Sequence, residues 1–253
     1  MSIIKPFRGI RPKKELAAQV AARPYDVLNS AEARVEAAGN PHSFLQVTKS
    51  EIDMPENLSI YDEQVYQKAR ENFHHFIDEG TLFQDDKECL YVYRQIMDGK
   101  SQFGLVCCCA IDDYFNDVIK KHEFTRPQKE QDRIKHMKTM GAHPGPVFST
   151  YPENADIDAL IAQVAENNPA EYDFTADDGV QHTLWVADDE ATISALVKLF
   201  ADEVPAIYIA DGHHRAASSA KVGGELREAN PNYTGKEDYN FLLSVLFTDN
   251  QLH

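Results

Sequence analysis

Apolar and polar residues alternate along this chain with two different spacings. Short apolar runs rich in β-branched and aromatic residues are typical of buried strands. A short strand is predicted to begin at Ile3, and residues 40–47 are predicted to lead into another. Asp98-Gly99 separates two of the longer runs and predicts a β-hairpin. The longer runs are 90–96, 103–110, 182–186, 206–210 and 241–247.

Helical spacing predicts helices in most of the segments between these runs. The clearest is 59–78, where apolar residues recur every four positions from Tyr61 to Phe73. Asp112-Asp113 is expected to cap a helix through Lys121. The other helices are expected at 15–22, 31–38, from about 126, at 156–167, after the cap at Asp188-Asp189, and from 213 to about 229.

The order of these elements predicts an α/β (α+β) fold built on a mixed sheet. Residues 182–210 form a predicted β-α-β unit, which delivers the chain to the polar stretch after Ala210. The chain has 253 residues, of which 43% are apolar, enough for a substantial core. We therefore expect 1–253 to be a single α/β unit.

Charge and cysteine content argue against several classes of protein. The chain has 41 acidic and 25 basic residues, a net charge of −16, whereas binding to duplex nucleic acid normally requires a basic face. The sequence lacks the apolar core of a signal peptide and any run of transmembrane length. Three of the four cysteines are consecutive, Cys107 to Cys109, which fits neither a zinc site nor a disulfide framework. We expect buried, reduced thiols in a cytoplasmic protein without nucleic-acid or membrane partners, and the sequence leaves the oligomeric state open.

The strongest candidate for a functional site follows the apolar run that ends at Ala210. Asp211-Gly212 breaks this strand, and the Ala/Ser-rich segment from His213 predicts a helix. Free N–H groups at a helix start favour anions, above all phosphate. His214 and Arg215 follow, and the planar fork of donors of an arginine suits phosphate oxygens. The alternative, ordinary turn chemistry at Asp-Gly with surface histidines, stays open at this point.

A second polar cluster occupies 122–136. Thr125, followed three residues later by Gln128, matches a capping box and predicts a helix that starts near Arg126. A solvated helix with ion pairs explains the same spacing. Because the helix has little apolar surface, something else must anchor it. Its polar residues on one side, or just before its start, are His122, Glu123, Lys129, Asp132, Arg133 and His136.

Two further polar stretches come earlier in the chain. Tyr25 and Asp26 place an aromatic ring beside a carboxylate in a segment expected to be extended. Asn40 and Ser43 flank Pro41-His42, where they serve a ligand or only order the turn.

These residues resemble known proteins. A strand followed by Gly-x-His-Arg at a helix start, here Gly212 to Arg215, resembles the nucleotide-phosphate motif of the ParB/sulfiredoxin superfamily, and the form Asp-Gly-His-His-Arg resembles its free serine kinases. The chain also resembles a bacterial family described only as a domain of unknown function, numbered ten-fifteen. That family has similar Pro-Phe-Arg-Gly, Pro-Tyr-Asp-Val and Asn-Pro-x-Ser-Phe stretches, although Arg23 stands here where a second proline is expected. The resemblance covers essentially the whole chain and includes His122, Glu123, Thr125, Lys129, Glu130, Asp132, Arg133 and His136.

The resemblance implies a ParB/sulfiredoxin-like mixed-sheet core with a helix-rich insertion. The core would come from about 1–50 and 180–250, and the inserted hairpin and helices from about 55–175. Members of the family are expected to continue well beyond this length, so we expect the chain to be a fragment or a short member.

The resemblance also implies a nucleotide-dependent kinase of small molecules. ATP or ADP, with Mg²⁺, would donate the phosphoryl group to a hydroxyl, and free L-serine is the leading candidate for the acceptor. Asp26, Glu123 and Asp211 are the candidate catalytic carboxylates, left unranked, and Asp211 or Glu123 is also a candidate Mg²⁺ ligand. The expected phosphate or nucleotide ligands are Gly212, His213, His214, Arg215, Lys129 and Arg133. The expected substrate-binding residues are Tyr25, Asn40, Ser43, His122, Thr125 and His136.

Two alternatives stay open. One is a non-enzymatic, nucleotide-binding regulator, because ParB-like folds also serve as nucleotide-gated switches. A more remote one is a metal-dependent hydrolase, whose mixed site would use His122, Glu123, His136, Asp211 and His213. The chain has no phosphate loop, no dinucleotide-binding glycine turn and no zincin helix. We expect the clusters around Asp26, 122–136 and 211–215 to converge on one cleft.

Overall fold

The structure, a computed structural model, describes residues 1–252. Within this range nine strands form one mixed sheet, in the order β6-β10-β7-β11-β5-β4-β9-β8 with β1 paired to β5. The predicted α/β (α+β) class with a mixed sheet is therefore confirmed. The strands are β1 (Ile4–Lys5), β4 (Leu90–Met97), β5 (Lys100–Ala110), β6 (Ile119–Lys120), β7 (Val147–Tyr151), β8 (Tyr172–Thr175), β9 (Gln181–Ala187), β10 (Ile207–Asp211) and β11 (Phe241–Thr248).

The sheet joins strands from distant parts of the chain. β4 and β5 form the predicted hairpin, and both turn residues have positive φ, 51° at Asp98 and 75° at Gly99, as a type I′ turn requires. β11 runs parallel to β7 and antiparallel to β5, so the last strand lies in the middle of the sheet. β9 and β10 form a β-α-β unit with α8 (Glu190–Glu203), but β7, β11, β5 and β4 lie between them.

The main hydrophobic core lies between this sheet and the helices α7 (Ala155–Asn167), α8 and α9 (His213–Ala229). Alternate residues of the central strands enter it, among them Cys107 and Cys109, which are fully buried and unbridged. Cys108 points to the other face and is partly exposed, and burial raises the pKa of its thiol to about 12. The predicted buried, reduced thiols are thus found at Cys107 and Cys109. No helix within residues 1–252 combines the length and the apolar character that a membrane span needs.

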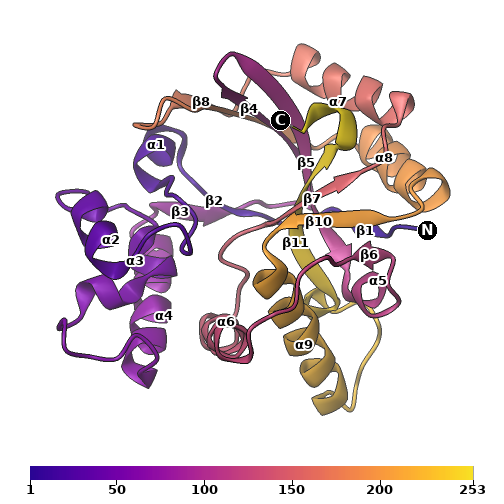
Figure 1. The fold of residues 1–253 in the computed structure, drawn as a ribbon. Coiled ribbons are helices and arrows are strands. Elements are labelled where there is room, and N and C mark those ends of the chain that lie inside the picture. Colours follow the sequence, from indigo (N-terminus) through magenta and orange to yellow (C-terminus); the bar gives the residue numbers. More distant parts are fainter. Residues whose placement is uncertain (253) are drawn as a thin grey trace.

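A second group of elements lies to the left of the sheet in Figure 1 and has small cores of its own. One core gathers Val20, Val47 and Phe76, and another gathers Leu28 and Leu45. A two-stranded sheet connects this group to the rest of the N-terminal segment. The elements are β2 (Ile10–Pro12), η1 (Lys14–Leu16), α1 (Ala17–Val20), α2 (Ser30–Ala37), α3 (Leu45–Thr48), η2 (Ser50–Asp53), α4 (Glu63–Asp78) and β3 (Leu82–Gln84).

The strand predicted after Asn40 is wrong, because residues 45–48 form the helix α3. Leu45 and Val47 would share one face of a strand, since side chains two apart point the same way. In the structure they are both fully buried but enter different clusters. Helical geometry separates the two side chains and so allows both contacts.

Three other expectations need correction. The segment predicted as one helix to Lys121 contains α5 (Ile111–Phe115), a turn at Asp117 with φ of 58°, and β6, because Ile119 pairs with Ile207 of β10. The stretch around Tyr25 and Asp26 is a turn and not extended, with the N–H of Val27 donating to the carbonyl of Pro24. The helix predicted from residue 59 begins at Glu63.

Helix α6 (Pro127–Met140) lies between α4 and α9 (Figure 1). Ile134 and Met137 pack against Val222 of α9, while Met140 enters the core that contains Val47 and Phe76. The predicted capping box is wrong, because Arg126 is the N-cap residue and the Thr125 hydroxyl donates instead to Glu130 at 2.7 Å. Side-chain packing at both flanks anchors this otherwise polar helix.

The close approach of α9 to η3 (Asp238–Asn240) depends on a glycine. A Cβ atom at Gly223 would lie 2.2 Å from the carbonyl oxygen of Tyr239 and 2.6 Å from Cδ1 of Ile111. At the next position, Gly224, the nearest atom would be Cζ of Phe115 at 3.7 Å, an ordinary contact.

We therefore expect Gly223→Ala to lower the free energy of unfolding by about 1–3 kcal/mol, the usual range for overpacking. Gly224→Ala is the matched control and should raise it by up to about 1 kcal/mol, because alanine favours the helix. Urea unfolding of both variants measures the difference. Equal effects would contradict the packing seen at Gly223.

Candidate functional site

The connection between β10 and α9 forms the centre of the candidate site. The pairing of β10 with β7 is irregular between Ile209 and Asp211, a bulge that turns the chain at the strand end. Gly212 follows with φ of 94°, in the left-handed region that favours glycine. A Cβ atom at Gly212 would also lie 3.0 Å from the guanidinium carbon of Arg215. No side chain within residues 1–252 caps the helix that starts at His213, so its first N–H groups stay available.

A cleft of about 660 Å³ opens at this helix start. The turn around Asp26, the loop before α6 and the β10–α9 connection form its walls, so residues from each of the three predicted clusters line one cleft. Its volume lies in the range of about 300–1,000 Å³ that is usual for ligand pockets. The lining residues are Pro24, Tyr25, Asp26, Val27, Glu123, Phe124, Arg126, Lys129, Asp211, Gly212, His213 and His214.

The charged side chains of this cleft differ in how far they are already paired. Arg126 and Lys129 are exposed, and neither side chain makes an ion pair or a hydrogen bond within residues 1–252. The same holds for the Asp26 carboxylate. In contrast, the Asp211 carboxylate accepts from Nη2 of Arg215 at 2.5 Å. The cleft therefore presents the cations of Arg126 and Lys129 and the carboxylate of Asp26 to a ligand, while the Glu123 carboxylate makes only a 3.7 Å contact with Nδ1 of His213.

The two histidines of α9 bring no positive charge to the cleft at neutral pH. Burial, followed by the charge of His122, lowers the pKa of His213. Burial, followed by the charge of Lys129, lowers the pKa of His214. As neutral imidazoles they donate or accept hydrogen bonds, or ligate metal ions.

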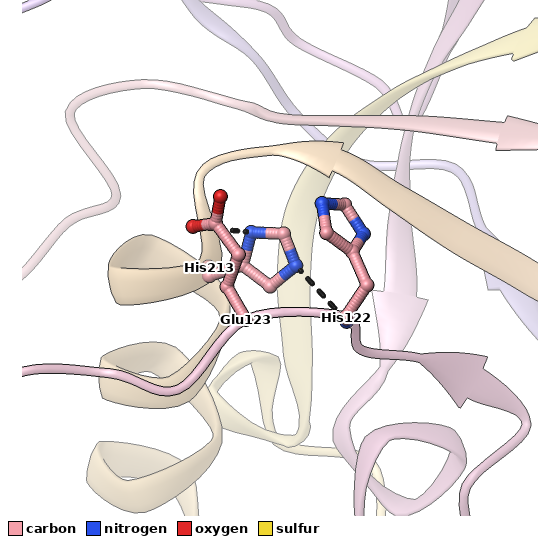
Figure 2. Close-up of side chains that lie close together, drawn as sticks. All are labelled: His122, Glu123 and His213. Carbon is pink, nitrogen blue, oxygen red and sulfur yellow. Dashed lines mark hydrogen bonds and ion pairs between the residues drawn. The ribbon is translucent and has the colours of Figure 1, made fainter.

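His122, Glu123 and His213 form a compact group at the edge of the cleft (Figure 2). One ligand atom from each lies within 4.8 Å of the others. The Glu123 carboxylate lies 3.7 Å from Nδ1 of His213, and the His122 and His213 rings meet edge to face at 4.4 Å. The backbone N–H of His122 donates to Nε2 of His213 over 3.4 Å, a long and weak bond.

Over residues 4–253 the chain matches the model of a family described as "Protein of unknown function (DUF1015)". The chain belongs to the DUF1015 family. This confirms the predicted membership of a domain-of-unknown-function family, while the likeness to ParB/sulfiredoxin proteins and serine kinases stays a prediction. No curated protein and no solved structure matches the chain significantly.

Two arginines of this DUF1015 protein that were predicted to hold phosphate do not line the cleft. The Arg215 guanidinium bonds Asp211 and the carbonyl of Pro146. Arg133 donates to Asp132 at 2.6 and 2.9 Å and lies over the Tyr25 ring, 4.1 Å from its centroid. Both support the walls of the cleft, because Asp211 and Tyr25 are lining residues.

Five predicted substrate-binding residues also lie outside the lining: His122, whose neighbour Glu123 lines the cleft, and Asn40, Ser43, Thr125 and His136. Thr125 bonds Glu130 at 2.7 Å and so ties the loop before α6 to the helix. Asn40 orders the turn between α2 and α3, since its amide donates to the Gln19 carbonyl and its oxygen accepts from the N–H of His42. Asn40 and Ser43 line a different cavity of about 1250 Å³, which meets the cleft at Pro24. His136 is 3% exposed, with Nε2 2.9 Å from the Val47 carbonyl.

Arg126 and Phe124 are cleft residues that the sequence analysis did not assign to the site. Arg126 was treated only as a helix start, although a cation beside Glu123 and Lys129 was visible in the sequence. Phe124 interrupts a polar loop, and its side chain is fully exposed. An apolar ring among polar residues before a helix is the signal that identifies it.

His136 generates a prediction about acid stability. Burial, together with the charge of Arg133, lowers its pKa from the ordinary 6.5 to about 4. Between pH 6.5 and pH 4, His136 is protonated in the unfolded chain but stays neutral in the folded chain. The free energy of unfolding that the neutral, buried His136 allows above pH 6.5 is therefore lost as the pH falls toward 4. The loss from this residue amounts to about 3 kcal/mol.

His136→Gln keeps a donor for the Val47 carbonyl and removes the titration. We expect its free energy of unfolding to fall less steeply than that of the wild type between pH 6.5 and 4, measured by urea unfolding. Because the carboxylates titrate in both proteins, the difference isolates His136. Parallel curves would contradict a neutral, buried His136.

Proposed function

We propose that this DUF1015 protein is a nucleotide-dependent phosphotransferase that phosphorylates the hydroxyl group of a small molecule. Its resemblance to ParB/sulfiredoxin-like serine kinases favours free L-serine as the acceptor and ATP or ADP as the donor. One observation carries the proposal. The uncapped start of α9 opens into the same cleft as the unpaired cations Arg126 and Lys129 and the unpaired carboxylate of Asp26.

Phosphoryl transfer depends mainly on positioning and on neutralising the phosphate oxygens. Backbone N–H groups at the start of α9 favour an anion, and Gly212 allows it to approach the backbone closely. Lys129 and Arg126 supply positive charge from the other wall of the cleft. The neutral side chains of His213 and His214 add donors without adding charge.

We rank the three candidate carboxylates by the partners that each already has. Asp211 already accepts a bond from Arg215, and Glu123 faces the imidazole of His213. Asp26 makes no hydrogen bond or ion pair within residues 1–252 and has no contact like that of Glu123 with His213, so we propose that it accepts the proton from the acceptor hydroxyl.

Carboxylate oxygens are the ligands that Mg²⁺ prefers, so the cleft fits this ion. Of the two candidate ligands, Asp211 and Glu123, Asp211 lies outside the group of His122, Glu123 and His213 and would hold the ion, where it would neutralise charge on the phosphates.

An exposed aromatic ring also supports nucleotide binding. Phe124 is fully exposed and Val27 is 57% exposed, and both line the cleft. Side chains without buried contacts contribute little to folding, so this apolar surface is available to a nucleobase.

The contribution of Lys129 to nucleotide binding can be tested with a matched control. Lys129→Ala should raise the Kd for ATP or ADP about tenfold, the low end for a hydrogen bond to a charged group. Lys135→Ala removes the same charge from the same helix, where its ammonium lies near the Tyr66 ring and away from the cleft. It should leave the Kd unchanged. Titration calorimetry at one fixed salt concentration measures the Kd of both variants. Equal losses of affinity in the two variants would mean that only the net charge of the protein matters.

Incubation of the protein with ATP or ADP, Mg²⁺ and L-serine tests the reaction itself. We expect O-phosphoserine, detected by mass spectrometry, and a loss of kcat of about 10²-fold or more in Asp26→Asn. Glu123→Gln and Asp211→Asn should lose less. If the protein binds nucleotide but transfers no phosphoryl group to any hydroxyl acceptor, the kinase proposal is replaced by the nucleotide-binding regulator. A smaller loss of kcat in Asp26→Asn than in Glu123→Gln and Asp211→Asn would contradict the role given to Asp26.

A further inference from the structure

The compact group at the cleft edge has a donor set that differs from the rest of the site. His122 and His213 each offer an imidazole nitrogen, and Glu123 offers carboxylate oxygens (Figure 2). Within residues 1–252 this is the one group of three histidine, cysteine or acidic side chains whose ligand atoms converge in this way. Imidazole nitrogen suits zinc and its first-row neighbours, whereas Mg²⁺ selects oxygen ligands.

The hydrolase alternative expected from the sequence also included His136 and Asp211 among the metal ligands. The structure places these two residues outside the converging group. His136 is buried against the Val47 carbonyl, and the Asp211 carboxylate is paired with Arg215. Neither belongs to the converging group. Two imidazole nitrogen donors and one carboxylate remain, which is a three-ligand set that leaves further positions open for water or substrate.

The distances require only small side-chain movements. In a tetrahedral zinc site with bonds of about 2.0–2.1 Å, ligand atoms lie roughly 3.4 Å apart. Separations of up to 4.8 Å between these ligand atoms must therefore shorten by at most about 1.4 Å. The His213 side chain is 5% exposed and held by its surroundings, but Glu123 is 66% exposed and His122 is exposed, so these two can close on it.

We propose that His122, Glu123 and His213 bind a divalent first-row transition metal ion such as Zn²⁺ or Co²⁺, in preference to Mg²⁺. The site goes beyond the proposed kinase function and does not depend on it, because its donors come from this chain alone. The ion would lie at the start of α9, next to the backbone N–H groups that favour anions. An open coordination position there would take an oxygen of an anionic ligand.

The test uses the full chain after treatment with a chelator and dialysis, in the absence of nucleotide. Titration with Co²⁺ is followed by its visible absorption, which reports inner-sphere nitrogen ligands and a low coordination number. We expect one ion per chain, and an excess of Mg²⁺ should not displace it. His122→Ala and Glu123→Gln change exposed side chains, so the fold is kept, and each should weaken Co²⁺ binding at least about tenfold.

His75→Ala is the matched control. On α4, Nε2 of His75 lies 3.2 Å from the Glu79 carboxylate, and His74 is adjacent, so the same residue types are present without a converging group. This variant should bind Co²⁺ like the wild type. An unchanged affinity in both His122→Ala and Glu123→Gln, an equal loss in His75→Ala, or no saturable binding by the wild type would overturn the metal site. Because no nucleotide is present, these outcomes are separate from the result of the kinase assay.

Discussion

The uncapped start of α9 is the constraint on which the rest of the site depends. Its first N–H groups need partners, and no side chain within residues 1–252 supplies one. The positive end of the helix favours anionic groups, and Asp26, Glu123 and Asp211 gather around it. Gly212 makes the arrangement possible, because its left-handed backbone and missing Cβ leave room for the Arg215 guanidinium beneath the turn. A bound anion would satisfy the N–H groups that the protein leaves open.

Helix α6 connects the start of α9 with the N-terminal group of elements, because it packs against both. Its polar face supplies Lys129 to the cleft, while Ile134, Met137 and Met140 fix the helix between its neighbours. The backbone of Glu130 accepts from the Ser218 hydroxyl of α9 at 3.1 Å, and the Glu130 side chain pairs with Lys221. Figure 1 shows α6 between the sheet with α9 on one side and the α1–α4 elements on the other, and the lining of the cleft comes from α6 and the loop before it, from the β10–α9 connection and from residues 24–27. A shift of α6 would change the spacing of its walls.

An acidic protein can bind an anion when cationic side chains without ion-pair partners lie close to the binding site. The net charge of −16 gives no long-range attraction for phosphates. Arg126 and Lys129 nevertheless face the helix start without carboxylate partners. Arg133 and Arg215 instead contact the Tyr25 ring and the Asp211 carboxylate, so they support the walls of the cleft.

Local chemistry made several features readable from the sequence. Asp98-Gly99 specified a hairpin because both residues tolerate positive φ, and Gly212 marked the change from β10 to α9 for the same reason. The longer apolar runs located β4, β5, β9, β10 and β11 because burial of a strand needs only local composition, whereas β6, β7 and β8 were not predicted as strands. The DUF1015 membership also followed from residues in sequence order.

Tertiary contacts decided the features that depend on distant partners. Residues 45–48 became helical because Leu45 and Val47 enter different clusters, which no local pattern reveals. Arg215 is occupied by the Pro146 carbonyl and Asp211, while Arg126 makes no hydrogen bond or ion pair within the described residues, although the sequence favoured the first as the phosphate ligand. Thr125 faces Glu130 and does not cap α6. Whether a polar side chain is available to a ligand depends on which groups the folded chain brings beside it, so only the tertiary structure could separate the supporting residues from the exposed ones.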